Sequence, residues 1–131
     1  MTKEDDPLER LELDKNSIDR EKLADALEDY IGIDQETAEP VFRAKYGSLS
    51  DKQKIVAYLL YRKAVVALGK EPEDEEGVES RQISDQTGVN YNTARGTLSR
   101  EDYIENDKEN GGYLIPGYSM NDAIEVLPDG E

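Results

Sequence analysis

The 131-residue chain contains no cysteine and no histidine. Without cysteine it has no disulfide framework, no thiolate zinc site and no cysteine nucleophile. Without histidine, imidazole metal ligands and imidazole acid–base catalysis are also excluded. The longest apolar run, from Ile55 to Tyr61, falls far short of the ~20 residues that a membrane-spanning helix needs. These absences exclude several classes of enzyme and a membrane-spanning helix.

Motifs that usually carry catalysis are missing as well. The chain has no Gly-rich phosphate loop, no serine in a nucleophile elbow and no cluster of metal ligands. Paired carboxylates such as Asp5 and Asp6 lie in polar runs, with no apolar pocket to shift their pKa. Residues 70–79 lack the ligand spacing of a calcium loop and predict a solvated acidic loop. We therefore expect no enzyme, no metal, no cofactor and no evident small-molecule site.

Basic residues are few. The chain has 16 against 31 acidic residues, a net charge of −15 and a sequence pI of about 4.3. One explanation is that the protein avoids or mimics nucleic acid; the other is that it comes from a salt-accumulating halophile. The acidic residues are scattered over the surface positions of every expected element, which favours the halophile. The acidic N-terminus also lacks an apolar signal region, so we expect a soluble cytoplasmic protein.

The charge is unevenly distributed along the chain. Residues 1–40 have a net charge of −9, residues 41–70 of +6 and residues 71–131 of −12. A basic island in an acidic protein is the electrostatic footprint expected for nucleic-acid contact. The alternative is that these basic residues pair with the acidic N-terminal helix.

Within the basic island, position along the chain separates two groups. Lys52 and Lys54 begin the helix that precedes the most informative stretch, and they are candidates for DNA phosphate contacts. Arg62 and Lys63 lie among apolar residues in the middle of the same helix. We expect these two to form ion pairs.

The N-terminal part has weaker signals. Residues 1–16 are charged without a clear period and predict a disordered acidic arm. Residues 17–49 predict a helical extension. Its first helix is capped by Asn16 or Ser17 and runs to about Ile31. The apolar stripe of that helix consists of Leu23, Leu27, Tyr30 and Ile31.

A second helix is expected from Asp34, restarted at Pro40 and ended by Gly47. The longest helix then runs from Asp51 to Leu68; Ser48 or Ser50 is its cap and Gly69 its stop signal. This long helix is apolar nearly all round, so it needs partners on two faces. Either the N-terminal helices or a second subunit supplies the additional partner, and the two arrangements are compatible.

The most informative stretch is residues 80–100. Ser80 can cap a short helix whose inward residue is Ile83, and Gly88 follows its last turn. Val89 fills the corner before a second helix, which Asn90 caps. Ala94 and Leu98 share the inward face of that second helix, and residues 90–100 contain no acidic side chain. An acid-free face in so acidic a chain predicts contact with a negatively charged partner.

A β-hairpin follows. Residues 103–107 and 113–115 are expected strands, and Asn110-Gly111 is a strong hairpin turn signal. Pro116 ends the second strand. Residues 119–131 predict a short helix capped by Ser119, covering residues 121–127 with Ala123, Ile124 and Leu127 inward, and a tail.

With these elements in this order, the chain resembles the winged helix-turn-helix superfamily of archaeal and bacterial transcriptional regulators. The matching residues are Arg81–Arg100 and the hairpin to Pro116. We therefore expect a mainly α fold with a small β-hairpin wing: a winged helix-turn-helix at residues 50–118, preceded by the helical extension.

The resemblance implies that the helix at residues 90–100 lies in the major groove of double-stranded DNA. The residues in position to contact bases are Tyr91, Asn92, Thr93 and Arg95. The residues in position to contact phosphates are Lys52, Lys54, Ser80, Arg81, Thr97, Arg100 and, at the wing tip, Lys108.

Two features depart from the family pattern. Glu105, Asp107 and Glu109 surround Lys108 in the wing, and three carboxylates near phosphates repel. Gly96 lies inside the second helix, where glycine costs about 1 kcal/mol relative to alanine. It either fits against a neighbouring helix or permits close approach to a phosphate.

The sequence thus predicts a sequence-specific DNA-binding protein, a transcriptional regulator of a halophilic archaeon or of its plasmid or virus. Such regulators commonly act as homodimers. The alternative is a winged-helix module that binds another protein and never contacts DNA.

Overall fold

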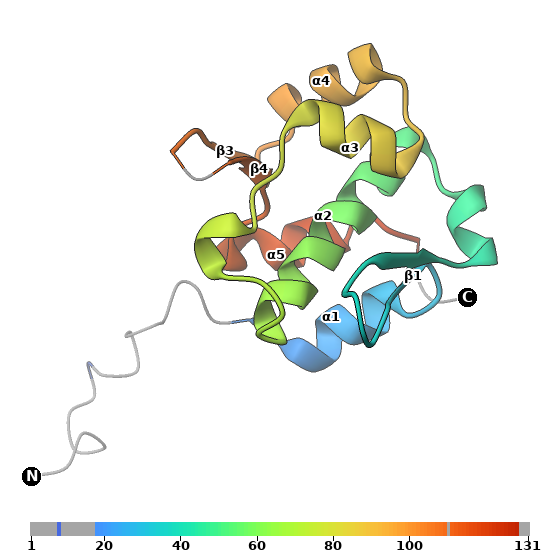
Figure 1. Ribbon diagram of the computed structural model, residues 1–131. Coiled ribbons are helices and arrows are strands. Elements are labelled where there is room, and N and C mark those ends of the chain that lie inside the picture. Colours follow the sequence, from blue (N-terminus) through green and yellow to red (C-terminus); the bar gives the residue numbers. More distant parts are fainter. Residues whose placement is uncertain (1–7, 9–17, 110, 129–131) are drawn as a thin grey trace, which may run out of the picture.

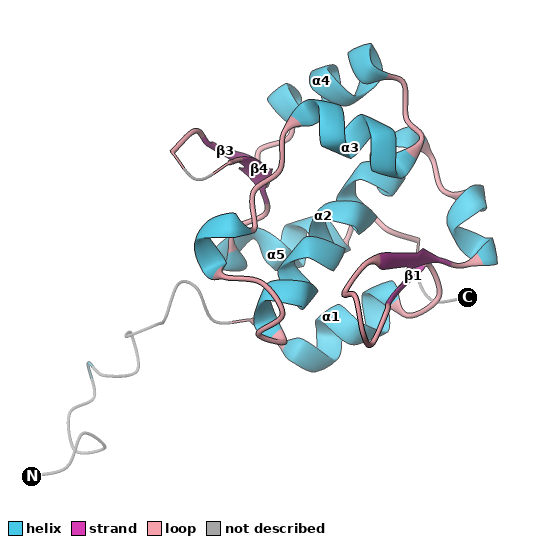
Figure 2. Ribbon diagram, in the orientation of Figure 1, coloured by secondary structure: helices cyan, strands magenta, loops and turns pink. Residues whose placement is uncertain are grey.

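The computed structural model describes residue 8, residues 18–109 and residues 111–128. Its α-helices are α1 (Arg20–Leu27), α2 (Asp51–Ala67), α3 (Ser80–Thr87), α4 (Tyr91–Arg100) and α5 (Met120–Ile124). Its strands are β1 (Ile31–Ile33), β2 (Pro40–Phe42), β3 (Glu105–Asp107) and β4 (Gly112–Leu114). Short 3-10 turns cover Ala44–Ser48, Glu73–Glu75 and Gly117–Ser119. The described chain is mainly helical, and its strands form two antiparallel hairpins (Figure 2), which confirms the helical class.

Helix α2 lies in the middle of the molecule, with α1 on one side and the α3–α4 pair on the other (Figure 1). Of the two predicted caps, Ser48 and Ser50, the structure selects Ser50: its hydroxyl accepts from the Gln53 N–H, and the Gln53 side chain accepts from the Ser50 N–H. Every residue from Ile55 to Lys63 is buried. The buried cluster around α2 contains side chains of α1, β1, α3, α4 and α5. The N-terminal segment therefore does supply the additional partner that the apolar surface of α2 needs.

The first helix is shorter than predicted. It begins at Arg20, because the Asp19 carboxylate accepts a hydrogen bond from the Lys22 N–H at 3.0 Å and so acts as the cap. It ends at Leu27, and Ile31 belongs to a strand instead. The proposed caps Asn16 and Ser17 lie outside the described residues, as does the arm apart from Leu8.

The helix predicted from Asp34 was wrong, and a β-hairpin stands there. Ile31 pairs with Phe42 and Ile33 with Pro40 in antiparallel register. The Asp34 carboxylate accepts from the N–H groups of Glu36 and Thr37, at 2.8 and 3.1 Å, which closes a turn between the strands. These two backbone hydrogen bonds lower the pKa of Asp34.

The predicted ion pairs of Arg62 and Lys63 are confirmed. Their partners lie after α2 rather than in the N-terminal helix: Arg62 pairs with Glu71 and Lys63 with Glu76, both at 3.1 Å. Arg62 also donates to the Glu75 carbonyl at 2.7 Å. The prediction of a merely solvated loop at residues 70–79 was therefore wrong, because Glu76 is only 6 % exposed.

The second hairpin, β3–β4, pairs Glu105 with Leu114. Tyr113 of β4 also exchanges two backbone hydrogen bonds with Val78, at 2.8 and 3.0 Å. This bridge ties the hairpin to the segment before α3. Gly112 has a φ of 125°, and a Cβ there would lie 2.5 Å from the Val78 carbonyl oxygen, so the close approach requires glycine. The expected turn residue Asn110 lies outside the described residues.

The C-terminal helix α5 is shorter than the 121–127 predicted, and the Ser119 side chain makes no capping hydrogen bond. Ala123 and Leu127 are buried as expected, whereas Ile124 is only partly buried. The Gln53 side chain donates to the Val126 carbonyl at 3.0 Å and holds this end against α2. Among the described helices, none combines the length and apolar character required to cross a bilayer.

Candidate nucleic-acid interface

The α3–α4 pair is held by a turn whose polar groups are satisfied internally. Gly88 ends α3 with a φ of 81°, as the sequence predicted. The Ser84 hydroxyl donates to the Val89 carbonyl at 2.6 Å. The Tyr46 hydroxyl donates to the Thr87 carbonyl at 2.8 Å, and burial raises the pKa of Tyr46. These bonds fix the relative position of the two helices.

The N-terminus of α3 differs from the prediction. Glu79 occupies the cap position without a side-chain capping bond, and Ser80 is the first helical residue. Ser80 is partly buried. Ser80 therefore does not cap the helix. It lies in the first turn of α3, and its contact with a DNA phosphate stays a prediction.

Helix α4 presents two distinct faces. Its cap is confirmed: the Asn90 side chain accepts from the Asn92 N–H at 2.9 Å. Ala94 and Leu98 are buried as predicted. Thr97 is also buried, with 2 % exposure, so its assignment as a phosphate contact was wrong. The spacing of three residues from Ala94 puts Thr97 on the inward face.

The outward face of α4 carries the remaining predicted base contacts. Asn92, Thr93 and Arg95 are exposed, and Tyr91 is partly buried. The Arg81 guanidinium of α3 lies 4.0 Å from the centre of the Tyr91 ring, and the Arg95 guanidinium lies 5.6 Å from it. One aromatic ring thus holds an arginine from each helix at the outer edge of the pair.

Arg100 folds back along its own helix. A Cβ at Gly96 would lie 3.1 Å from an Arg100 guanidinium nitrogen and within 4 Å of no atom of another helix. Of the two alternatives for Gly96, a fit against a neighbouring helix was therefore wrong, and a close approach to a phosphate stays a prediction. The missing side chain leaves room for the exposed Arg100 to lie over the turn.

The two lysines at the start of α2 already have partners. Lys52 forms an ion pair with Glu101 at 3.1 Å, and this hydrogen bond lowers the pKa of Glu101. Lys54 lies 5.6 Å from the centre of the Tyr46 ring. Both remain beside the α3–α4 pair, but the Glu101 carboxylate offsets the charge of Lys52. A phosphate would have to compete with that carboxylate.

The β3–β4 hairpin is acidic at its exposed positions. Lys108, Glu105 and Glu109 are exposed, and Asp107 accepts from the Glu109 N–H at 3.2 Å. Hydrogen bonding to Glu105 raises the pKa of the exposed Tyr118 hydroxyl. Lys108 is therefore the single cation on a hairpin with three carboxylates.

Three arginines stay available on this surface. Within the part of the chain that the structure describes, Arg81, Arg95 and Arg100 form no ion pair. The sequence predicted Arg81 and Arg95 as DNA contacts but did not show that both lie against Tyr91, because Arg81 and Tyr91 are ten positions apart in the chain. Only the spacing of four between Tyr91 and Arg95 was readable as a helix neighbour pair.

The described residues contain no group of three acidic side chains that could hold a metal ion. The fold and the surface together define a mainly helical protein with an exposed arginine cluster on a two-helix unit. Comparison with protein-family models, curated proteins and solved structures finds no match to this chain.

Proposed function

We propose that α2, α3, α4 and the β3–β4 hairpin form a winged helix-turn-helix. The order of three helices followed by a hairpin supports this assignment. The bridge from Tyr113 to Val78 supports it further, because it ties the hairpin to the chain just before α3. The hairpin then lies beside the helix pair as a wing.

We propose that this unit is a sequence-specific DNA-binding module and that the protein is a transcriptional regulator. The observation that carries the proposal is the outer face of α4, which is acid-free and presents Asn92, Thr93 and Arg95 beside Arg81. Arginine and asparagine form bidentate hydrogen bonds with guanine and adenine edges in the major groove. Helix α4 enters that groove, and the Arg81 and Arg100 guanidiniums bind the flanking phosphates.

The net charge of −15 fits a halophilic cell. In concentrated salt, the release of counterions from DNA contributes little to binding. Affinity must then come from shape and from direct base contacts rather than from many lysines. A few arginines on a two-helix unit fit binding that depends on base contacts and shape. The ion pair of Lys52 with Glu101 also fits, because it removes a lysine from phosphate contact.

We also propose that the protein binds DNA as a homodimer. One α4 helix of ten residues contacts few base pairs, and a two-fold dimer doubles the site. The two half-sites would then lie one helical turn apart and form an inverted repeat.

The test is selection of genomic DNA fragments by the full-length protein in near-molar KCl, followed by sequencing. We expect a shared motif, arranged as an inverted repeat. The double variant Asn92→Ala/Arg95→Ala should lose the enrichment, whereas Lys22→Ala, which removes an exposed cation of α1, should keep it. Equal enrichment by the protein and the double variant would overturn the proposal.

A second function is favoured by the acidic hairpin. Glu105 and Glu109 are exposed at the position of the wing, where carboxylates repel DNA phosphates. A winged-helix module that docks a basic partner protein would use this hairpin instead of α4. Loss of a bound partner in Glu105→Lys/Glu109→Lys, with no DNA motif recovered for the unmodified chain, would support this alternative.

A further inference from the structure

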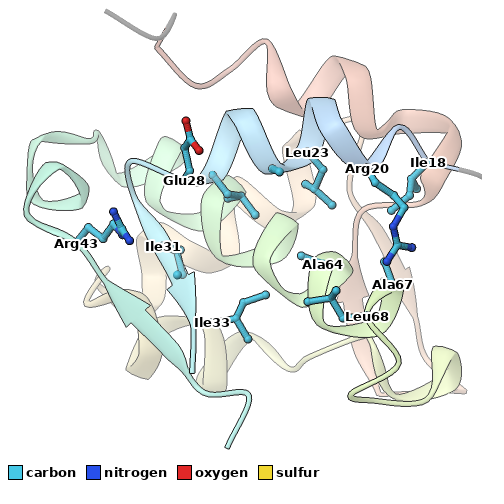
Figure 3. Close-up of a pocket in the computed structure, with 13 residues that line it drawn as sticks. Ile18, Arg20, Leu23, Glu28, Ile31, Ile33, Arg43, Ala64, Ala67 and Leu68 are labelled. Atoms are coloured by element: carbon cyan, nitrogen blue, oxygen red, sulfur yellow. The ribbon is translucent and has the colours of Figure 1, made fainter. Parts of the chain in front are cut away.

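An apolar cavity lies on the far side of α2 from the proposed DNA-binding helix. It has a volume of about 300 Å³ and is lined by residues of α1, β1 and the last turns of α2. Its apolar walls include Leu23, Leu27, Ile31, Ile33 and Ala67. Figure 3 shows Leu23, Ile31, Ile33 and Ala67 around the space between α1, the strand and the end of α2.

The charged groups of this cavity lie at its two ends. Arg20 lies beside Ile18, Ala67 and Leu68 at one end, whereas Arg43 and Glu28 lie at the other (Figure 3). Neither arginine forms an ion pair with the residues that the structure describes. The Arg43 end contains a carboxylate of its own, whereas none of the described residues that line the Arg20 end is acidic.

From this arrangement we propose that the cavity binds a small amphipathic carboxylate, with its carboxylate on Arg20 and its apolar tail along α1 toward β1. A guanidinium binds a carboxylate through two parallel hydrogen bonds. At the opposite end the Glu28 carboxylate offsets the positive charge of Arg43, so charge favours the anionic head on Arg20. The apolar tail is removed from water by the leucine and isoleucine walls.

The volume limits the size of the ligand. One water molecule occupies about 30 Å³ in the liquid. At about that volume for each non-hydrogen atom, the cavity holds roughly ten such atoms. Octanoate has this size and is therefore the probe. Leu68 is 54 % exposed at the rim, so the cavity is open for entry.

The experiment is calorimetric titration of the full-length protein with octanoate, below the concentration at which the acid forms micelles. We expect one octanoate per chain, and weaker binding of uncharged octanol and of octyltrimethylammonium. Arg20→Gln should weaken octanoate binding about tenfold, the effect of losing a charge-assisted hydrogen bond. Lys22→Gln, two residues along the same helix but outside the cavity, is the matched control and should bind normally.

A second variant tests the location of the site. Ala67→Phe places a ring in the cavity from the partly buried end of α2. It should abolish octanoate binding while the thermal unfolding of the protein without ligand stays normal. Three outcomes overturn the proposal: no octanoate binding, equal binding of octanoate and octanol with no effect of Arg20→Gln, or unchanged binding in Ala67→Phe. Conversion of a dimer to a monomer by Ala67→Phe, without octanoate binding by the unmodified protein, would instead identify an interface between two copies.

Discussion

The cations in the middle of α2 and those on the α3–α4 surface differ in their partners. Lys63 is buried and pairs with the equally buried Glu76 at 3.1 Å, and Arg62 is bound to Glu71 and to a backbone carbonyl. Arg81 and Arg95 lie on the outside and contact a tyrosine ring instead of a carboxylate. Positive charge on α2 therefore stabilises contacts within the chain, whereas the arginines on α3 and α4 form no ion pair with the described residues.

The difference shows that a local excess of basic residues in an acidic protein does not by itself indicate a free cationic surface. The basic island of residues 41–70 looked like the footprint of DNA contact, yet four of its seven cations, Lys45, Lys52, Arg62 and Lys63, form ion pairs within the described chain. The proposed DNA contact therefore rests on the acid-free face of α4 rather than on the count of lysines and arginines. Five predictions test this contrast.

The largest effect is expected at the buried pair. Lys63→Ala leaves Glu76 buried without its cation, which should cost about 3 kcal/mol of the free energy of unfolding. Urea denaturation at neutral pH measures it. The double variant Lys63→Met/Glu76→Leu should recover most of the loss, since it removes both charges. A loss below about 0.5 kcal/mol in Lys63→Ala would show that the pair contributes little.

For Arg95 we expect a loss of DNA affinity without a loss of stability. Arg95→Ala should reduce affinity for the selected DNA motif about tenfold or more, because a bidentate base contact is lost. Its free energy of unfolding should stay within about 0.5 kcal/mol of the unmodified protein, as for most exposed positions. Fluorescence anisotropy with labelled DNA, together with urea denaturation, separates the two quantities. Reduced stability with normal DNA affinity would reverse the assignment.

A smaller effect is expected from the ring that holds both arginines. Tyr91→Leu removes the contact with Arg81 and Arg95 and should weaken DNA binding about fivefold, the size of one cation–π interaction at an exposed site. Tyr91→Phe keeps the ring and is the matched control for loss of the hydroxyl. If the phenylalanine and leucine variants bind equally weakly, the hydroxyl matters rather than the stacking.

The smallest effect concerns the pair between Lys52 and Glu101. Because Lys52 lowers the pKa of Glu101, the pair stabilises the folded protein above the ordinary pKa of a glutamate, and this contribution is lost as the pH falls through the lowered value. We expect about 0.5 kcal/mol or less in dilute salt, since the pair is partly exposed. Acid titrations of stability for the protein and for Glu101→Gln measure the difference.

The same variant also frees Lys52. Glu101→Gln should strengthen non-specific DNA binding and make its dependence on salt steeper by about one released counterion. An unchanged salt dependence would show that Lys52 does not reach a phosphate even when its partner is removed.

Sequence patterns predicted the helix pair well and the N-terminal segment poorly. Gly88, Asn90, Ala94 and Leu98 all behave as expected, because a positive-φ turn, a cap and an inward spacing of four are local signals. Residues 31–42 were predicted to include a helix from Asp34, but they form the β1–β2 hairpin. There the Asp34 carboxylate closes a turn rather than starting a helix.

Thr97 and Arg81 show the same limit within the site. Thr97 is polar and lies among polar residues, but the packing of α4 against the core buries it. Arg81 and Tyr91 come from different helices, so only the turn between those helices decides that they meet.

The sequence by itself determined the helices α2, α3 and α4, the cap of α4, the hairpin after α4 and the absence of acidic residues on the face of α4. Each depends on spacing or composition within about ten residues. Only the tertiary structure decided which cations are neutralised, that Val78 bridges to Tyr113, and that α1 and β1 enclose a cavity against the end of α2. Those outcomes depend on contacts between segments far apart in the chain, where periodicity and propensity carry no information.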